Sequence, residues 1–176
     1  MVRLEKMSAR PMTDRTIRPL TSSDLPEALA LQAQGYPVAL QDGPAAFASR
    51  IAVAPGWCWA AVAGGRLDGY LLSHPWTSLA PPSPDTMLTR AEGDVWYIHD
   101  LSTAAHARGQ GVARALLAAC EAAKPALPRS ELVAIEGAAP FWSRLGWRVA
   151  EPEPEGLRAK LAAYGPAAVY MTRSRD

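Results

Sequence analysis

Two features of the sequence carry groups that could do chemistry. The first is a glycine loop, Arg108-Gly109-Gln110-Gly111, and the second is His99, which precedes the loop in a stretch rich in aromatic and β-branched residues. The first backbone amides of a helix lack internal partners and, with the positive end of the helix dipole, they attract anions. A histidine can accept a proton near neutral pH. The sequence therefore predicts an anion site close to a general base.

The residues after the loop restrict which anion it can hold. A nucleotide-triphosphate loop needs Lys and then Ser or Thr after the second glycine, but Val112 and Ala113 occupy those positions. A dinucleotide-binding loop needs a third small residue where Arg114 stands. Binding of NAD by an oxidoreductase is therefore an alternative that Arg114 disfavours, and an ordinary turn without a ligand is the other alternative.

A strand and a helix must position this loop. From Val95 to Ser102 the residues alternate between two largely apolar faces, which is typical of a covered strand. After Gly111 the apolar residues recur at helical spacing until Pro125, which ends the helix. The anion site is therefore expected where a central strand passes directly into an amphipathic helix.

Size and composition favour one ordinary domain. The chain has 176 residues, 49% of them hydrophobic, and we expect a loose leader at residues 1–14 and a single domain at residues 15–176. A net charge of +1 argues against nucleic acid and anionic membranes as partners, and no apolar run is long enough to span a membrane. Cys58 and Cys120 lack metal-ligand spacing, so we expect reduced core thiols, no metal and a cytoplasmic protein.

The other elements follow from periodicity and turn residues. The pattern predicts, in order, a strand at 16–20, helices at 25–34 and 44–54, a hairpin of strands at 57–63 and 67–73, a long loop at 74–93, the central strand and helix, a strand at 131–136, a helix at 140–145, and a final strand pair at 147–149 and 168–171 around a helix at 157–164. This alternation predicts an α/β fold.

The spacing Arg108-x-x-Gly111-x-Ala113 resembles the pyrophosphate loop of the GNAT superfamily, and the order of elements resembles that family from about residue 16 to residue 173. The resemblance implies a mixed, mostly antiparallel sheet flanked by helices, in which the central strand and the next strand run parallel and splay apart. It also implies an enzyme that moves an acetyl group from acetyl-CoA, as cosubstrate, to a primary amine by direct attack in a ternary complex.

The resemblance assigns the coenzyme-binding residues by their positions in the family motif. Backbone amides of the loop would bind the pyrophosphate, Leu101 and Thr103 would pair with the pantetheine arm, and Trp142 would form a wall of the tunnel. The full set is Leu101, Ser102, Thr103, Arg108, Gly109, Gln110, Gly111, Val112, Ala113, Arg114 and Trp142. The Leu101 N–H is also the candidate oxyanion donor.

The candidate base is His99, which shares a strand face with Leu101. The arylalkylamine N-acetyltransferases of this superfamily resemble the chain here, since they have histidines at the positions of Tyr97 and His99. A buried structural histidine is the other interpretation of His99. Glu136, on the predicted neighbouring strand, is the reserve base, whereas Asp100 points to the opposite face and favours a structural role.

The chain departs from the family after the fifth strand. Many members have a tyrosine there that protonates the departing thiolate, but this chain has Trp142, and an indole is no practical acid. Either Tyr97, Tyr164 or Tyr170 takes that role, or the thiolate, with a thiol pKa of ~8.5, leaves unassisted. The missing tyrosine also leaves open a degenerate domain that binds acyl-CoA as a sensor or interaction module without turnover.

The acceptor is the least constrained part of the reaction. By analogy with the fold, it would enter between residues 35–41 and residues 151–156, where Glu151, Glu153 and Glu155 could attract a cationic amine or could simply form a solvated loop. Trp57, Trp59 and Trp76 could line an apolar site or pack in the core. We expect a small amine or an exposed amino group as the acceptor, and a homodimer stays open.

Overall fold

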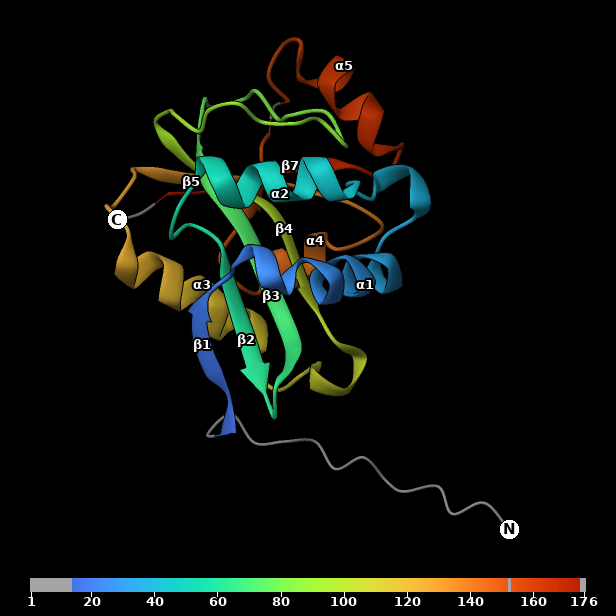
Figure 1. The fold of residues 1–176 in the computed structure, drawn as a ribbon. Helices are drawn as coiled ribbons and strands as arrows, with labels where there is room; N and C mark the ends of the chain where they lie inside the picture. Colours follow the sequence, from blue (N-terminus) through green and yellow to red (C-terminus); the bar gives the residue numbers. More distant parts are fainter. Residues whose placement is uncertain (1–13, 152, 175–176) are drawn as a thin grey trace.

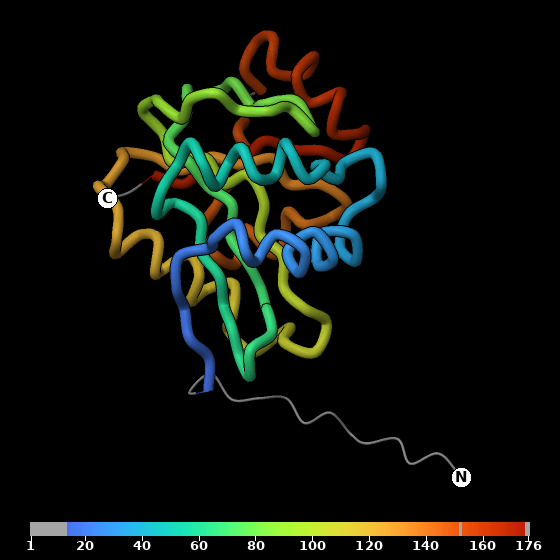
Figure 2. Tube along the Cα trace, viewed as in Figure 1, coloured from blue at the N-terminus to red at the C-terminus, as the bar shows by residue number. Residues whose placement is uncertain are grey.

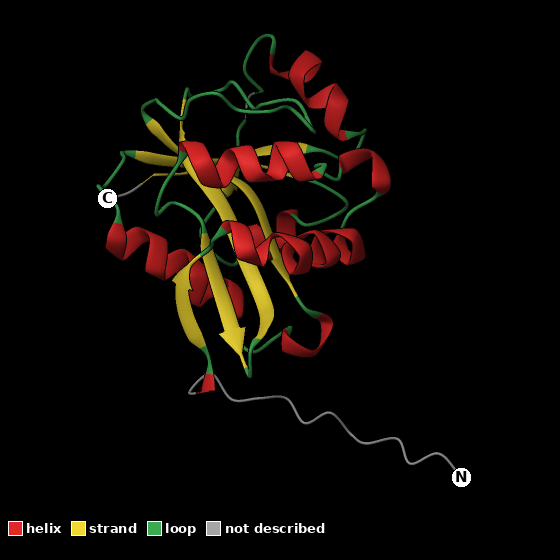
Figure 3. Cartoon of the chain, in the orientation of Figure 1, coloured by secondary structure: helices red, strands yellow, loops and turns green. Residues whose placement is uncertain are grey.

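A computed structural model describes residues 14–151 and 153–174 of the chain. Its centre is a seven-stranded sheet, drawn as arrows in Figure 1 and in yellow in Figure 3. The strand order is β1-β2-β3-β4-β5-β7-β6. The strands are β1 (Thr16–Pro19), β2 (Trp59–Ala63), β3 (Arg66–Trp76), β4 (Val95–Thr103), β5 (Arg129–Ala134), β6 (Arg148–Val149) and β7 (Val169–Ser174).

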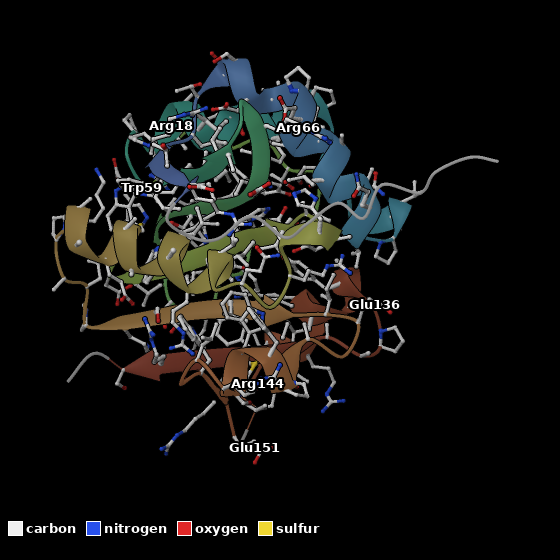
Figure 4. The ribbon with its side chains drawn as sticks, turned by 90° about the horizontal axis from the view of Figure 1, so that it is seen from below. Arg18, Trp59, Arg66, Glu136, Arg144 and Glu151 are labelled. Carbon is white, nitrogen blue, oxygen red and sulfur yellow. The ribbon has the colours of Figure 1, made fainter. Side chains whose placement is uncertain are left out.

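Helices cover both faces of the sheet. They are α1 (Leu25–Gly35), α2 (Pro44–Val53), α3 (Val112–Ala123), α4 (Ala139–Ser143) and α5 (Leu157–Leu161). Figure 1 shows α1 and α2 in front of the sheet, and Figure 4, seen from below, shows α3 and α4 on the other side. The core is formed where α1, α2 and α3 pack their apolar residues against β2, β3 and β4. This arrangement confirms the expected α/β fold with a mixed, mostly antiparallel sheet.

The central strands pair in two different ways. β4 runs antiparallel to β3 along most of its length, but it runs parallel to β5. Within the described chain, the parallel pairing covers three residues on each strand, from Trp96 to Ile98 and from Ser130 to Leu132. Beyond Ile98 the two strands separate, which confirms the expected splayed pair.

A bulge accompanies this separation. Leu72 of β3 lies opposite Asp100, but the next residue, Ser73, lies opposite Ile98, so His99 is the extra residue on β4. A bulge bends a strand and changes the direction of its side chains. It therefore sets the orientation of His99 at the point where β4 leaves β5.

Several expected strand boundaries were wrong. β3 does not end at Ser73 but continues through Trp76, because residues 74–76 pair with residues 95–97 of β4. Pro75 is tolerated there because β2 pairs with β3 no further than Leu71, so a missing N–H on that side breaks no ladder bond. β2 begins at Trp59 instead of residue 57, and β5 ends at Ala134 instead of residue 136. The proposed leader falls almost entirely outside the described residues, so the division at residue 14 stays a prediction.

Gly69 allows β3 to approach both the end of β4 and the start of α3. A Cβ atom at this position would lie 2.9 Å from the Ser102 carbonyl oxygen and 2.9 Å from Val112 Cγ1. Distances this short require the backbone of β4 or the N-terminus of α3 to move. The absence of a side chain at Gly69 therefore sets the spacing of the strand and helix that flank the glycine loop.

We expect Gly69→Ala to lower the free energy of unfolding by about 1–3 kcal/mol, because overpacking a well-filled core costs that much. Urea denaturation followed by circular dichroism would measure it. Gly35→Ala is the matched control, since a Cβ there has its nearest neighbour at 3.9 Å, in Ser102 Oγ, and alanine favours the helix. Equal stabilities for the two variants would contradict the proposed close approach.

Candidate active site

The glycine loop leaves α3 with an open N-terminus. Gly111 caps the helix in the left-handed conformation (φ 80°), and Gly109 has φ 73°. Space above both glycines is open, since a Cβ on either would meet nothing within 4 Å. Ala115 is the residue whose N–H first donates back along the helix, to the Gly111 carbonyl (2.9 Å). The amides of Val112, Ala113 and Arg114 therefore have no helical acceptor and can serve a ligand.

A cavity of about 660 Å³ adjoins these amides. Three arginines lie on its walls, Arg108 and Arg114 from the loop and helix and Arg144 from the residue after α4. Figure 4 labels Arg144 beside α4. The remaining walls are Leu101, Thr103, Ala107, Gly109, Gly111, Val112, Ala113, Phe141 and Leu145. Amides at a helix N-terminus together with three guanidinium groups suit an anion with more than one negative charge.

Most of the residues predicted to bind the coenzyme lie on these walls, but Ser102, Gln110 and Trp142 are absent from them. The Ser102 side chain is buried, and its hydroxyl faces the Asp100 carboxylate at 3.4 Å. The Gln110 side-chain carbonyl accepts a hydrogen bond from Arg15 (2.6 Å), and the Gln110 backbone N–H donates to the Ala107 carbonyl (3.3 Å). Sequence reasoning missed Arg144, for which the only signal was its closeness to Trp142 in the sequence.

A second cavity, of about 100 Å³, occupies the gap between the diverging strands. Leu101 and Phe141 are shared with the first cavity, so the two spaces meet at these side chains. Trp142 is also on its wall, where it packs edge to face against Trp147. The other walls are Tyr36, Ile98, His99, Asp100, Leu132, Val133, Ile135 and Ala138.

A third cavity, of about 40 Å³, continues from the second toward the long loop after β3. The two share Tyr36, His99, Asp100, Val133 and Ile135. Its further walls are Gln32, Leu40, Asp42, Pro84 and Tyr164. The three cavities thus form a series from the glycine loop, through the strand gap, to a polar pocket beyond His99.

The predicted acceptor entrance is only half present in this pocket. Tyr36 and Leu40 come from the expected segment 35–41. On the other side, however, Pro84 and Tyr164 replace the glutamates of residues 151–156. Glu153 instead pairs with Arg158 at the surface (3.1 Å), and Glu151 points away from the protein at the bottom of Figure 4.

His99 is held by a buried chain of charged groups. Its Nε2 lies 3.2 Å from Asp42 Oδ2, and Asp42 Oδ1 lies 3.2 Å from Arg50 Nη2. Burial and the nearby Arg50 charge lower the pKa of His99, although Asp42 opposes them, so the imidazole is neutral at pH 7. When Nε2 carries the ring proton and donates a hydrogen bond to Asp42, Nδ1 carries the basic lone pair. His99 Nδ1 has no hydrogen-bond partner among the described residues.

Asp100 accepts hydrogen bonds from two phenols. Tyr36 and Tyr70 both donate to its carboxylate. Burial raises the pKa of Asp100 to about 6, and the hydrogen bonds from the two tyrosines oppose that rise. Burial, together with the Asp100 charge, raises the pKa of Tyr36 well above its usual value, so Tyr36 keeps its proton at neutral pH.

Tyr97, Tyr164 and Tyr170, which the sequence indicates as possible acids, are absent from the walls of the gap between β4 and β5. Tyr97 is buried among Leu157, Leu161 and Tyr170, and it is absent from the walls of the three cavities. Tyr170 donates to Glu131, and Tyr164 reaches the third cavity while donating to the Pro82 carbonyl.

Among the described tyrosines, Tyr36 is the one on the walls of the gap between β4 and β5. Tyr36 is not among the tyrosines that the sequence indicates as acids, although it lies in the segment predicted to admit the acceptor. Glu136, the reserve base, is exposed in the turn after β5 (φ 46°) and is absent from the walls of all three cavities of the described chain. Trp57, Trp59 and Trp76 are likewise absent from those walls.

Solved structures with the same fold are numerous. The GphF GNAT-like decarboxylase in complex with isobutyryl-CoA has 19% sequence identity and a TM-score of 0.70, covering 90% of this chain and 98% of its own. The loading GNATL domain of CurA from Lyngbya majuscula has 14% identity and a TM-score of 0.73, covering 91% and 97%. Arabidopsis thaliana Naa50 in complex with the bisubstrate analogue CoA-Ac-MVNAL has 15% identity and a TM-score of 0.64, covering 92% and 99%.

Sequence comparison gives the family. No curated protein matches the chain. Across the described residues, no helix is both long enough and apolar enough to pass through a bilayer. The sequence model of the Acetyltransferase (GNAT) family matches residues 24–147, which is most of the chain and includes the glycine loop, β4 and α4. The chain therefore belongs to the GNAT acetyltransferase family.

Proposed function

We propose that the protein transfers an acyl group, acetyl in the simplest case, from acyl-CoA to a primary amine by direct attack in a ternary complex. The observation that carries the proposal is the series of three cavities with shared walls. It begins at an arginine-lined helix N-terminus, passes through the gap between β4 and β5, and ends at a polar pocket beyond His99. A long thiol cosubstrate with a charged end fits this order.

The first two cavities supply the groups that the coenzyme requires. The amides of Val112 to Arg114 and the charge of Arg108 would receive the diphosphate, and Arg144 would add a third positive charge. Leu101 and Thr103 would then face the pantetheine arm with their main chains. Two proteins of the same fold, GphF and Naa50, are named as complexes with isobutyryl-CoA and with a CoA-containing analogue, which supports coenzyme A as the ligand.

The second and third cavities supply the groups for the transfer. A neutral His99 would take one proton from the incoming ammonium, and the amine nitrogen would then attack the thioester carbonyl carbon. The carbon–sulfur bond breaks, and the second proton of the nitrogen passes to the departing thiolate, so that an amide and a free thiol are released. Asp42 would hold His99 in the tautomer with a free Nδ1. Tyr36 would turn its hydroxyl proton from Asp100 to the departing sulfur and donate a hydrogen bond to it. Because the Tyr36 pKa is high, we propose stabilisation of the thiolate rather than complete proton transfer.

The polar third cavity supports an amine as the acceptor. Asp42 and Asp100 lie on its walls beside Tyr36 and Tyr164, so it can attract an ammonium and hydrogen-bond to it. A small amine or an exposed amino group is consistent with the volume of about 40 Å³, which admits little more than the amino group itself. N-acetylglutamate synthase of Neisseria gonorrhoeae, another protein of this fold, has been solved in complex with coenzyme A and N-acetyl-glutamate.

An acyl-CoA-binding module without turnover is the second candidate. Two observations favour it: Trp142 stands where many family members have an acid, and both nitrogens of the His99 ring are shielded, one by Asp42 and one by burial. This candidate predicts binding of acyl-CoA without release of free thiol in the presence of amines. An oxidoreductase, in contrast, predicts thermal stabilisation by NAD and none by CoA.

The decisive experiment measures free thiol released from acetyl-CoA during incubation with a panel of primary amines, for the wild-type protein and for His99→Gln. We expect amine-dependent thiol release by the wild type and a loss of about 100-fold or more in kcat for the variant, because general base catalysis contributes about that much. The wild-type rate should fall below pH 6.5 as His99 becomes protonated, and the variant should lack this limb.

The control for that experiment is the affinity for CoA, measured by thermal shift, which His99→Gln should retain. Binding of CoA by the wild type with no thiol release for any amine would support the module and contradict the transferase. An unchanged pH profile in His99→Gln would remove His99 from the role of base.

Tyr36→Phe tests the proposed stabilisation of the thiolate. One hydrogen bond to a charged group is worth about 1.5–3 kcal/mol, so we expect kcat to fall about 10- to 100-fold. Tyr70→Phe is the matched control, because Tyr70 donates to the same carboxylate of Asp100 but lies on none of the three cavity walls in the described chain. Equal losses of kcat in the two variants would show that Tyr36 acts only through Asp100.

A further inference from the structure

A second cluster of charged and polar side chains lies beside the glycine loop, outside the walls of the first cavity. It consists of Arg15, Asp68, His106 and Gln110, which we call the loop brace. Arg15 Nε donates to Asp68 Oδ2 (2.6 Å), and Arg15 Nη2 donates to Gln110 Oε1 (2.6 Å). His106 Nε2 lies 2.8 Å from Asp68 Oδ1, and Gln110 Nε2 donates to the His106 carbonyl (2.6 Å). The four residues thus form a closed ring of hydrogen bonds, which passes through the main chain of His106.

The loop brace connects the loop to β3. The Asp68 carbonyl accepts a hydrogen bond from the Ala104 N–H (2.8 Å), so Asp68 holds the start of the loop by its backbone and by its side chain. Through Arg15 it also reaches Gln110, next to the two open glycines. Figure 2 shows the chain after β4 turning close to the tip of the β2–β3 hairpin, where Asp68 lies. Both ends of segment 104–110 are therefore fixed to one strand.

The ion pair between Arg15 and Asp68 is buried, so breaking it is energetically unfavourable. The side chains of Arg15 and Asp68 are 0% and 3% exposed. Burial by itself would raise the pKa of Asp68, but the hydrogen bonds and charges of Arg15 and His106 outweigh it and lower the pKa. Asp68 is consequently charged at neutral pH, and removing its charge leaves Arg15 buried without a counterion. A buried ion pair is weak evidence for added stability, but it restricts the conformations of the groups that it connects.

The loop brace lies outside the arginine-lined cavity. Gln110, His106, Asp68 and Arg15 are all absent from the walls of the arginine-lined cavity, although Arg108, Gly109 and Gly111 belong to the same loop and lie on them. The brace therefore cannot contact an anion in that cavity directly. It can act on binding only by fixing the backbone whose amides and glycines point into the cavity.

We propose that Asp68 is a positioning residue for the coenzyme, and this inference rests on the proposed function. Through Arg15 and His106 it holds the loop in the conformation that receives the diphosphate. A loop that is ordered before binding loses less conformational entropy when the ligand binds. Weakening the brace therefore lowers the affinity for CoA without altering the chemistry at His99.

The test compares Asp68→Asn with the wild type in CoA binding, steady-state kinetics and amide hydrogen exchange. We expect the Kd for CoA and the KM for acyl-CoA to rise about tenfold or more, whereas the KM for the amine and the pH limb below 6.5 stay unchanged. Without ligand, amide exchange over residues 105–114 should become faster. A role in stability alone would lower Tm but would not separate the two KM values.

Two further variants keep the test decisive. Asp24→Asn is the control, since it breaks another ion pair, with Arg18 (2.7 Å), that is not part of the brace, and it should leave the affinity for CoA unchanged. Gln110→Ala opens the ring at a half-buried position and decides the question if Asp68→Asn does not fold. Unchanged affinity and exchange in Asp68→Asn and Gln110→Ala, with a wild type that binds CoA, would overturn the brace alone. A wild type that does not bind CoA would overturn the proposed function as well.

Discussion

The whole site depends on how briefly β4 and β5 remain paired. Parallel strands form a continuous ladder only while they stay about 4.8 Å apart, and here the pairing covers the three residues from Trp96 to Ile98 and then stops. The bulge at His99 occurs at the same point. The divergence opens the middle cavity of the series, and it turns the end of β4 toward the glycine loop, so a single feature of the sheet sets both the gap and its contents.

The polar groups around this gap are stabilised by one another. Asp42 links His99 to Arg50, and Asp100 gathers two phenols, so each buried carboxylate has several donors. An unpaired charge at such depth would be very unfavourable, and these networks therefore fix where each side chain points. Fixed orientation is what an active site requires, since a proton acceptor and a hydrogen-bond donor must face the same reacting atoms.

In the glycine loop, too, some residues adjoin the cavity and others hold the backbone in place. Arg108 and the amides of α3 adjoin the cavity, whereas Gln110 and His106, from the same short segment, are absent from its walls. His106 joins β3 through Asp68, and Gln110 does so through Arg15. Loops are flexible unless their backbone groups have partners. The close approach of Gly69 to β4 and α3 adds a steric constraint to these hydrogen bonds.

The sequence by itself determined the elements and the loop. Periodicity located α1, α2 and α3 nearly to the residue, and the spacing of Arg108, Gly111 and Ala113 identified the family, because helical period and glycine position are local properties. Only the tertiary structure decided which side chains meet. Tyr36 and Asp42 precede β4 by more than fifty residues, yet they lie at His99 and Asp100, because packing between distant segments leaves no periodic trace in the sequence.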